Sequence, residues 1–214
     1  MLVFTGILVL FSALAIFFRK QITLYFIRLK HGKYSYQFVK QFKKYANKSP
    51  FPYCFKDDIL PYLRLSISKR DSAERLKSEH EILFENIPFL TPVQSIINHY
   101  GNPNCFNAFI VKGIELRVFG YNRILFGNQI KVAFFIVGNV FIMGEYIIDD
   151  LAGINLEEIA GQILNLSKTE TNNKTLHFII DGKNEKSVLF YENGFSLLIR
   201  YHLRSDEILR KMTE

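Results

Sequence analysis

The stretch KVAFFIVGNVFI, residues 131–142, decides the fold. It places Gly138-Asn139 between two runs rich in Val, Ile and Phe, and a Gly/Asn pair in this setting is typical of a two-residue hairpin turn. The stretch KSVLFYENGFSL, residues 186–197, has the same shape around Asn193-Gly194. Residues 131–135 are too apolar for strict alternation, which favours a strand that is buried on both faces. The two stretches therefore predict a sheet built from hairpins.

Helical patterns precede both hairpins. Residues 92–100 predict a short helix, because apolar residues follow at helical spacing and Gly101-Asn102-Pro103 ends the pattern. A second helix is predicted over residues 155–166 and an exposed one over 68–83. Strands are predicted at residues 108–111, 115–120, 129–137, 140–148, 176–180, 187–191 and 195–203.

These elements define the expected fold class. We expect an α+β protein with an N-terminal transmembrane helix, followed by short helices packed on an antiparallel sheet of hairpins. One interpretation of the repeated pattern is two tandem helix-plus-three-strand units. The other is chance, because hairpins are common and two of them can resemble one another. The predicted divisions are residues 1–20 (transmembrane helix), 21–50 (basic amphipathic stalk), 51–89 (helical connector), 90–150 (first unit) and 151–214 (second unit).

The transmembrane prediction rests on Leu2–Phe18, which is apolar except at Thr5, Gly6 and Ser12. As a helix it would extend about 25 Å, the short end of what crosses a bilayer. A cleaved signal peptide is less favoured, because the first residues carry no positive side chain and no small-residue cleavage site follows. A buried core helix is also less favoured, because the segment has no polar face. We expect a single-pass anchor.

Positive charge is concentrated directly after this segment. Ten of the 27 Lys and Arg residues lie between residues 19 and 56, where the chain has no Asp or Glu. The positive-inside rule then predicts a bacterial inner-membrane protein with its C-terminal domain in the cytoplasm. This basic stretch can be a topology determinant and solvated linker, and its interleaved aromatic residues also suit contact with the lipid bilayer; the two interpretations are compatible. The predicted membrane-surface residues are Arg19, Lys20, Arg28, Lys30, Lys33, Lys40, Lys43 and Lys44. Nucleic acid is not an expected partner, because the remainder of the chain is acidic on balance.

One segment carries a family resemblance. Residues 90–103, LTPVQSIINHYGNP, followed by hairpins, resemble the SmpA/OmlA family, small lipoproteins of the bacterial outer-membrane barrel-assembly machinery. That family and the β-lactamase-inhibitor proteins of similar fold pair a short helix ending in Gly-x-Pro, here Gly101 and Pro103, with a meander of strands. The resemblance covers residues 90–149 and implies a protein-binding fold without catalytic residues. The chain departs from the family in lacking a lipobox cysteine near its N-terminus.

The cysteines offer one candidate for nucleophilic catalysis. Cys105 lies six residues after His99, and a thiolate–imidazole pair is a known catalytic arrangement. The plainer interpretation is that Cys54 and Cys105 are buried and, in a cytoplasmic domain, reduced.

Other candidate groups have similarly plain interpretations. The acidic pairs Asp149-Asp150 and Asp57-Asp58 can do acid/base work or cap helices. His177 and His202 fall in strand patterns, but two ligands do not make a usual zinc site. His80 is expected to be solvated. Because phosphate-loop, Gly-x-Ser-x-Gly and His-Glu-x-x-His motifs are absent, no catalytic residue, cofactor or metal is predicted.

The function predicted from these features is a non-catalytic, membrane-anchored binding or scaffold protein with a protein partner. One alternative is a membrane-bound enzyme that uses the Cys/His pair or an Asp pair. Another is a domain whose sheet cups an apolar ligand such as a lipid. The candidate partner surface consists of Phe134, Phe141 and Phe195.

Overall fold

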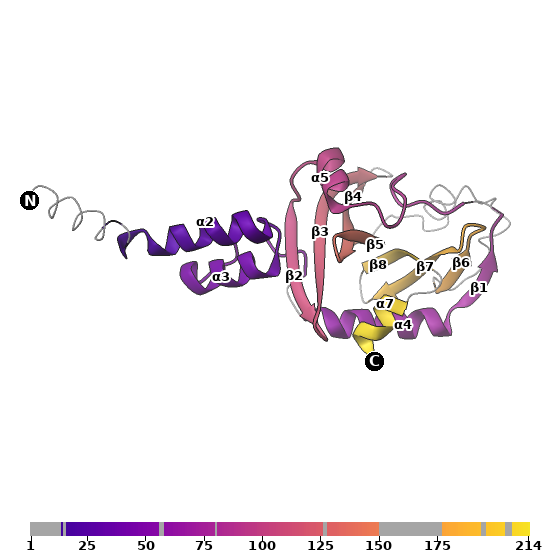
Figure 1. The fold of residues 1–214 in the computed structure, drawn as a ribbon. Coiled ribbons are helices and arrows are strands. Elements are labelled where there is room, and N and C mark those ends of the chain that lie inside the picture. Colours follow the sequence, from indigo (N-terminus) through magenta and orange to yellow (C-terminus); the bar gives the residue numbers. More distant parts are fainter. Residues whose placement is uncertain are drawn as a thin grey trace, which may run out of the picture. The chain divides into compact units, whose positions relative to one another are not determined.

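A computed structural model describes residues 14, 16–55, 58–79, 81–125, 128–149, 177–193, 196–203 and 207–214. The chain divides into two compact units, Met1–Pro52 and Tyr53–Glu214, which are described separately (Figure 1). The first contains helices, and the second contains the whole sheet.

The first unit contains a helical hairpin of α2 (Arg19–His31) and α3 (Tyr36–Ala46). Gly32, with φ 82°, turns the chain out of α2, a backbone conformation that favours glycine. Ser35 then caps α3, because its hydroxyl accepts a hydrogen bond from the Phe38 N–H at 3.2 Å. Lys20, near the start of α2, places its Nζ 6.0 Å from the ring centre of Tyr45, near the end of α3. The two helices therefore run antiparallel.

The second unit is built on one eight-stranded mixed sheet with the strand order β1-β6-β7-β8-β5-β4-β3-β2. Its strands are β1 (Glu74–Lys77), β2 (Cys105–Val111), β3 (Ile114–Leu125), β4 (Asn128–Val137), β5 (Val140–Ile148), β6 (Phe178–Asp181), β7 (Lys186–Asn193) and β8 (Ser196–Leu203). Its described helices are α4 (Ile59–Ser72), α5 (Val93–Tyr100) and α7 (Glu207–Thr213).

Two antiparallel meanders make up most of this sheet. Strands β2 to β5 form one and β6 to β8 the other, and β5 pairs with β8 where they meet. Gly138 and Asn139 both have positive φ, 55° and 80°, as a type I′ turn requires, so the predicted hairpin at this dipeptide is confirmed. The predicted helix at residues 92–100 is also confirmed, beginning one residue later at Val93.

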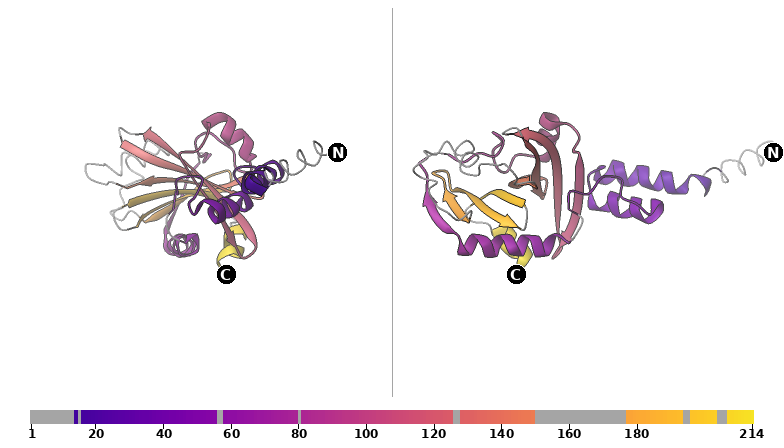
Figure 2. Two further views of the ribbon diagram at one scale, coloured as in Figure 1. Left: turned by 90° about the vertical axis from the view of Figure 1, so that its left-hand side faces the viewer. Right: turned by 180° about the vertical axis from the view of Figure 1, so that it is seen from behind.

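Helices α4 and α7 pack on one face of the twisted sheet (Figure 2). Ile59 and Leu63 of α4 and Met212 of α7 belong to the same apolar core as Val118 and Phe135 of the sheet. Burying such side chains contributes about 1.5–3 kcal/mol each, which accounts for the placement of both helices. Helix α5 contacts the opposite face, where the Tyr100 ring lies 5.2 Å from that of Phe134.

The structure contradicts the predicted transmembrane helix. Most of Leu2–Phe18 lies outside the described residues, and none of the helices in the described part is long and apolar enough to cross a membrane. The described helix that follows, α2, carries Arg19, Lys20, Arg28 and Lys30, whose charges exclude it as a span. The predicted single-pass topology and the predicted inner-membrane localisation with a cytoplasmic domain are therefore contradicted.

The predicted fold class also needs correction in its sheet. The sheet is mixed rather than antiparallel, because β1 pairs in parallel with β6, Glu74 opposite Phe178. Strand β1 occupies a segment predicted to be helical, and α4 begins earlier, at Ile59. Both meanders belong to one sheet, so they share a core. The helix predicted at residues 155–166 lies outside the described residues.

Candidate functional site

A tight turn at Phe84–Ile87 builds the most distinctive site of the second unit. The Ile87 N–H donates to the Phe84 carbonyl at 2.9 Å. The central residues Glu85 and Asn86 both have positive φ, 53° and 58°, which defines a type I′ turn. Asn tolerates this conformation, but Glu rarely adopts it, at a cost on the order of 1 kcal/mol. The strained backbone of the turn therefore holds the Glu85 carboxylate in a fixed position.

Phe84 anchors this turn to the sheet. Its side chain is fully buried, and its ring lies about 5 Å from those of Phe134, Tyr146 and Tyr201, at 5.1, 4.9 and 5.1 Å. Gly144 of β5 makes room for it, because a Cβ at that position would collide with the Phe84 ring. Packing of this kind over-determines the turn and sustains its strain.

The Glu85 carboxylate receives two phenol hydrogen bonds. The Tyr100 hydroxyl of α5 donates to Oε2 at 2.9 Å, and the Tyr146 hydroxyl of β5 donates to Oε1 at 2.6 Å. The Arg123 guanidinium of β3 lies 3.9 Å from Oε2 and 5.0 Å from the centre of the Tyr100 ring. Three distant segments thus converge on one carboxylate, and the Arg123 charge compensates it.

Burial and the carboxylate keep these phenols protonated. Burial raises the pKa of Tyr146 and of Tyr100 above the ordinary value, and the nearby Glu85 charge raises both further. Burial, followed by the same charge, also raises the pKa of Tyr201 on β8. All three tyrosines therefore stay neutral over the physiological range, and Tyr100 and Tyr146 act as hydrogen-bond donors to Glu85.

These groups line an open pocket of about 340 Å³, which we call the tyrosine pocket. Its described lining is predominantly polar and aromatic, and comprises Leu83, Glu85, Asn86, His99, Tyr100, Arg123, Leu125, Tyr146 and Tyr201. The volume lies at the lower end of the range for small-molecule sites. A carboxylate, a guanidinium, an amide and an imidazole lie together in the described lining, so the pocket can bind a ligand through hydrogen bonds.

A second polar cluster lies on the opposite face of the sheet and is closed to solvent. Arg200 of β8 and Glu145 of β5 form an ion pair, with Arg200 Nη2 2.8 Å from Glu145 Oε1, and both side chains are buried. The Tyr62 hydroxyl of α4 donates to Glu145, and the Arg200 guanidinium lies 4.8 Å from the Tyr62 ring centre. Burial raises the pKa of Glu145, although Arg200 opposes this. The cluster joins α4 to the sheet and has a structural role.

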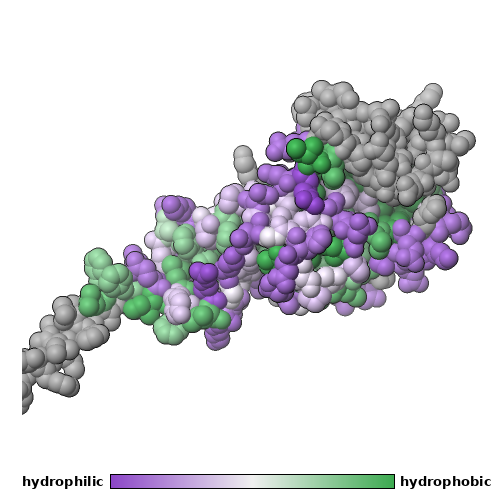
Figure 3. Space-filling model, turned by 90° about the horizontal axis from the view of Figure 1, so that it is seen from above, coloured by the Kyte–Doolittle hydropathy of each residue, from purple (hydrophilic) through white to green (hydrophobic). Residues whose placement is uncertain are grey.

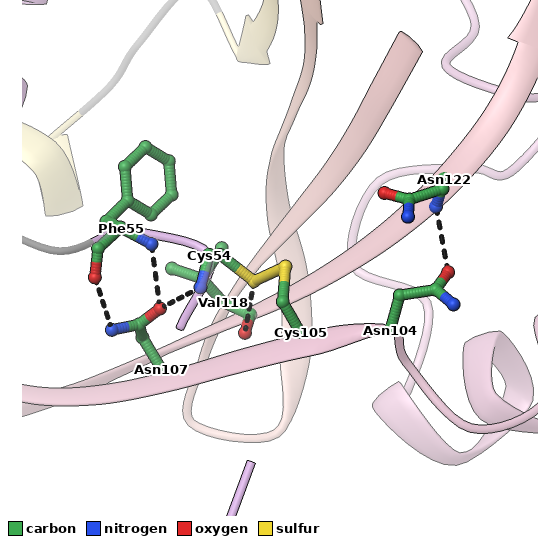
Figure 4. The surroundings of a disulfide bond; sticks show 7 residues. All are labelled: Cys54, Phe55, Asn104, Cys105, Asn107, Val118 and Asn122. Atoms are coloured by element: carbon green, nitrogen blue, oxygen red, sulfur yellow. Dashed lines mark hydrogen bonds between the residues drawn. A yellow bond between two sulfur atoms is a disulfide. The ribbon is translucent and has the colours of Figure 1, made fainter. Parts of the chain in front are cut away.

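A disulfide links Cys54 to Cys105, so the prediction of two reduced cysteines is wrong (Figure 4). The Asn107 side chain reinforces this link: its Oδ1 accepts from the Cys54 and Phe55 N–H groups at 2.7 and 3.0 Å, and its Nδ2 donates to the Phe55 carbonyl. Cys105 therefore has no thiol to pair with His99, which lies in the tyrosine pocket. The bond fastens the chain before α4 to strand β2.

The other predicted candidates do not assemble into a site. Asp149 accepts a hydrogen bond from the Ser196 hydroxyl at 3.1 Å, and a ring nitrogen of His177 lies 2.6 Å from the Lys69 carbonyl. Over the described ranges, no group of three or more metal-ligating side chains comes together. Four further candidates, His80, Asp57, Asp150 and Phe195, lie outside those ranges.

The two described members of the predicted partner surface are not exposed. Phe134 and Phe141 are both fully buried in the aromatic cluster around Phe84.

The predicted membrane-surface bases are distributed over the helical hairpin and its turn: Arg19, Lys20, Arg28 and Lys30 on α2, Lys33 in the turn, and Lys40, Lys43 and Lys44 on α3.

The tyrosine pocket was missed because its groups are scattered along the chain. Tyr100 is the last residue of the helix predicted over residues 92–100, and nothing in that pattern marks its hydroxyl as functional. The strand predicted over residues 115–120 stops short of Arg123, whereas β3 continues to Leu125. One local signal was present, the sequence Glu85-Asn86-Ile87-Pro88, in which Asn and Pro are typical of a turn.

Comparison of the chain with protein-family models, curated proteins and solved structures gave no match. The resemblance of residues 90–149 to the SmpA/OmlA family therefore stays a prediction.

Proposed function

We propose that the unit Tyr53–Glu214 is a non-catalytic binding domain and that its tyrosine pocket binds a neutral saccharide. The observation that carries this proposal is the Glu85 carboxylate, held by the Tyr100 and Tyr146 hydroxyls at the edge of an open, tyrosine-lined pocket.

The charge balance of the pocket favours a neutral ligand. Glu85 and Arg123 carry opposite charges 3.9 Å apart, so neither a strong anion nor a strong cation gains a large net attraction. Each keeps unused hydrogen-bonding capacity: the carboxylate has further lone pairs, and the guanidinium has five N–H donors. Asn86 adds both a donor and an acceptor. Ligand hydroxyl groups, which donate and accept, match this set.

The tyrosines favour a hydroxyl-rich ligand over a flat apolar one, because the Tyr146 and Tyr201 rings are buried and leave polar groups as the main lining of the pocket. Tyr100, Tyr146 and Tyr201 come from a helix and two strands whose positions are fixed by the core, so their rings are preorganised. A sugar carries hydroxyl groups around its rim, which can donate to and accept from the polar groups of the lining. A flat, purely apolar ligand would leave the polar lining groups without partners, at a cost of about 1–3 kcal/mol each.

Binding is favoured over glycoside cleavage by the number of carboxylates. Glycosidases generally use two, and Glu85 is the single carboxylate in the described lining. Both Glu85 oxygens already accept phenol hydrogen bonds, which stabilise the charged form and oppose a role as proton donor.

The Cys54–Cys105 disulfide supports a location for this activity. Structural disulfides persist in oxidising compartments and are rare in a reducing cytosol. We therefore place the binding domain in an oxidising compartment, where extracellular or cell-wall saccharides are accessible.

The test is binding of the full chain to a panel of neutral mono-, di- and trisaccharides, followed by titration calorimetry with the strongest binder. Glu85→Gln removes the charge but keeps the shape, and we expect it to weaken binding about 10–100-fold, because hydrogen bonds to charged groups contribute about 1.5–3 kcal/mol. Glu79→Gln, an exposed carboxylate outside the pocket, is the matched control. Binding that is unaffected by Glu85→Gln, or a panel without any binder, contradicts the proposal.

A further inference from the structure

Helix α2 of the helical hairpin exposes an apolar stripe. Five large apolar side chains recur at positions i, i+4, i+7, i+8 and i+11, which places them on one face of the helix. They are 42–64% exposed, far more than large apolar side chains in a folded unit usually are. The apolar stripe consists of Phe18, Ile22, Tyr25, Phe26 and Leu29.

Helix α3 does not cover this stripe. Lys20, Leu24 and Ile27 share another face of α2, which lies about 200° around the helix axis from the first residue of the stripe. Lys20 reaches the Tyr45 ring of α3, and Leu24 and Ile27 are both partly buried. The hairpin therefore packs through one side of α2 and leaves the apolar stripe on the other side.

The charge around the stripe has a single sign. Between residues 16 and 55 the chain has nine Lys and Arg residues and no Asp or Glu. Arg19 and Lys30 flank the stripe on one side and Arg28 on the other, and their long aliphatic stems can lie along apolar material while the charged ends stay in water. Figure 3 shows hydrophobic and hydrophilic residues next to one another on the part of the surface that follows the grey N-terminal residues.

We propose that α2 docks on an anionic lipid surface. The helix lies parallel to the surface, the apolar stripe enters the boundary between headgroups and acyl chains, and the flanking bases contact anionic headgroups. This arrangement is peripheral and requires no residue to cross the bilayer.

Charge complementarity selects this partner over two others. A second copy of the same helix would bring bases against bases, since the region carries no acid to pair with them. Nucleic acid would satisfy the bases but leave Phe26 and Leu29 in water, because these aliphatic and aromatic groups face outward among the charges. An anionic bilayer satisfies both sets of groups.

The test is co-sedimentation of the full chain with vesicles of phosphatidylcholine alone or with one third phosphatidylglycerol. We expect binding to the anionic vesicles that weakens steeply with added salt. Reversing the three exposed bases that flank the stripe, Arg19→Glu, Arg28→Glu and Lys30→Glu, should reduce partitioning at least about 100-fold, because each base near an anionic surface contributes roughly fivefold. The matched control reverses three exposed lysines of the other unit: Lys77→Glu, Lys112→Glu and Lys183→Glu.

A second variant separates insertion from charge attraction. Phe26→Ser with Leu29→Ser keeps every base and removes two exposed apolar groups, so it should lose most binding at high salt and retain part of it at low salt. Circular dichroism checks that the exposed substitutions leave the helices intact. Equal binding to both kinds of vesicle, equal losses in the charge variant and its control, or RNA that binds the hairpin more tightly than anionic vesicles would each overturn the proposal. A stable dimer that depends on Phe26 and shows no vesicle binding would do so too.

Discussion

Glu145 and Arg200 are direct cross-strand partners on β5 and β8, and their ion pair is fully buried where the two meanders join. An ion pair in this position has lost its hydration, and its mutual attraction only partly offsets that loss. The pair fixes the register of β5 against β8, because a shift of either strand would leave one charge buried without its partner.

Arg200→Met should therefore destabilise the second unit by about 3–5 kcal/mol, because it leaves the Glu145 charge uncompensated. Adding Glu145→Leu should recover most of this loss, since an apolar pair of similar size is often neutral or stabilising. Urea unfolding of the two variants measures both values. The pair Arg75–Asp181, in which the Arg75 side chain is half exposed, is the control, and Arg75→Ala should cost less than about 1 kcal/mol. A double variant no more stable than Arg200→Met would contradict the explanation.

Loss of the disulfide should lower the free energy of unfolding of the second unit. The bond joins residues 51 positions apart, and the chain-entropy relation then gives about 4 kcal/mol. Unfolding with and without a reductant measures the effect. Cys54→Ser with Cys105→Ser should match the reduced protein and should not respond to reductant. A reduced protein as stable as the oxidised one would show that the disulfide contributes little beyond the Asn107 hydrogen bonds and the packing of the segment before α4.

Gly144→Ala should disturb the tyrosine pocket from beneath. The added Cβ would collide with the Phe84 ring, which anchors the strained turn at Glu85. We expect a loss of about 1–3 kcal/mol in stability, typical of overpacking, and weaker ligand binding at Glu85. Combining it with Phe84→Leu tests the mechanism, because the second change makes room for the methyl group. The two effects should then be less than additive, and simple additivity would exclude this contact as the cause.

Stability should fall as the pH rises above 10. Tyrosines in the unfolded chain ionise near this ordinary pKa of 10.0, whereas burial raises the pKa of Tyr100, Tyr146 and Tyr201 in the folded unit. Above this pH the folded state binds more protons than the unfolded state, so unfolding is favoured as the pH increases. Phenolate absorbance during an alkaline titration should rise together with the loss of circular dichroism. In the Tyr146→Phe variant the pH dependence should be shallower. An equally steep fall would contradict the assignment.

Local sequence signals predicted the strands of both meanders well, because each hairpin is encoded within about 20 residues by alternating or apolar runs and a turn dipeptide. The structure bears this out at Gly138-Asn139. Such local signals do not predict strand β1. Its sequence, Glu-Arg-Leu-Lys, is charged and mostly exposed, as an edge strand often is, and its partner β6 lies about one hundred residues further along the chain.

The binding site was harder to predict than the fold for a related reason. Glu85, Tyr100, Arg123 and Tyr146 belong to four separate segments, and they meet only because the sheet brings β3, β5 and α5 together. Composition and spacing describe residues that are close together in the sequence, whereas the residues of this site are mostly far apart in the sequence. The disulfide was missed because the N-terminal charge pattern predicted a reducing compartment, and the pairing geometry of Cys54 and Cys105 depends on the folded sheet.

The pairing of β5 with β8 also has a consequence for the order of synthesis. Strand β5 is complete once Ile148 has left the ribosome, but its second partner begins only at Ser196. At ~5–20 residues per second, a largely apolar strand edge stays open for roughly 2–10 seconds while the rest of the chain is made. During that interval the open edge of the nascent first meander can pair with another nascent chain before its own partner strand has been made. The yield of correctly folded protein is then governed by translation speed and by chaperones that cover this edge, in addition to the stability of the finished sheet.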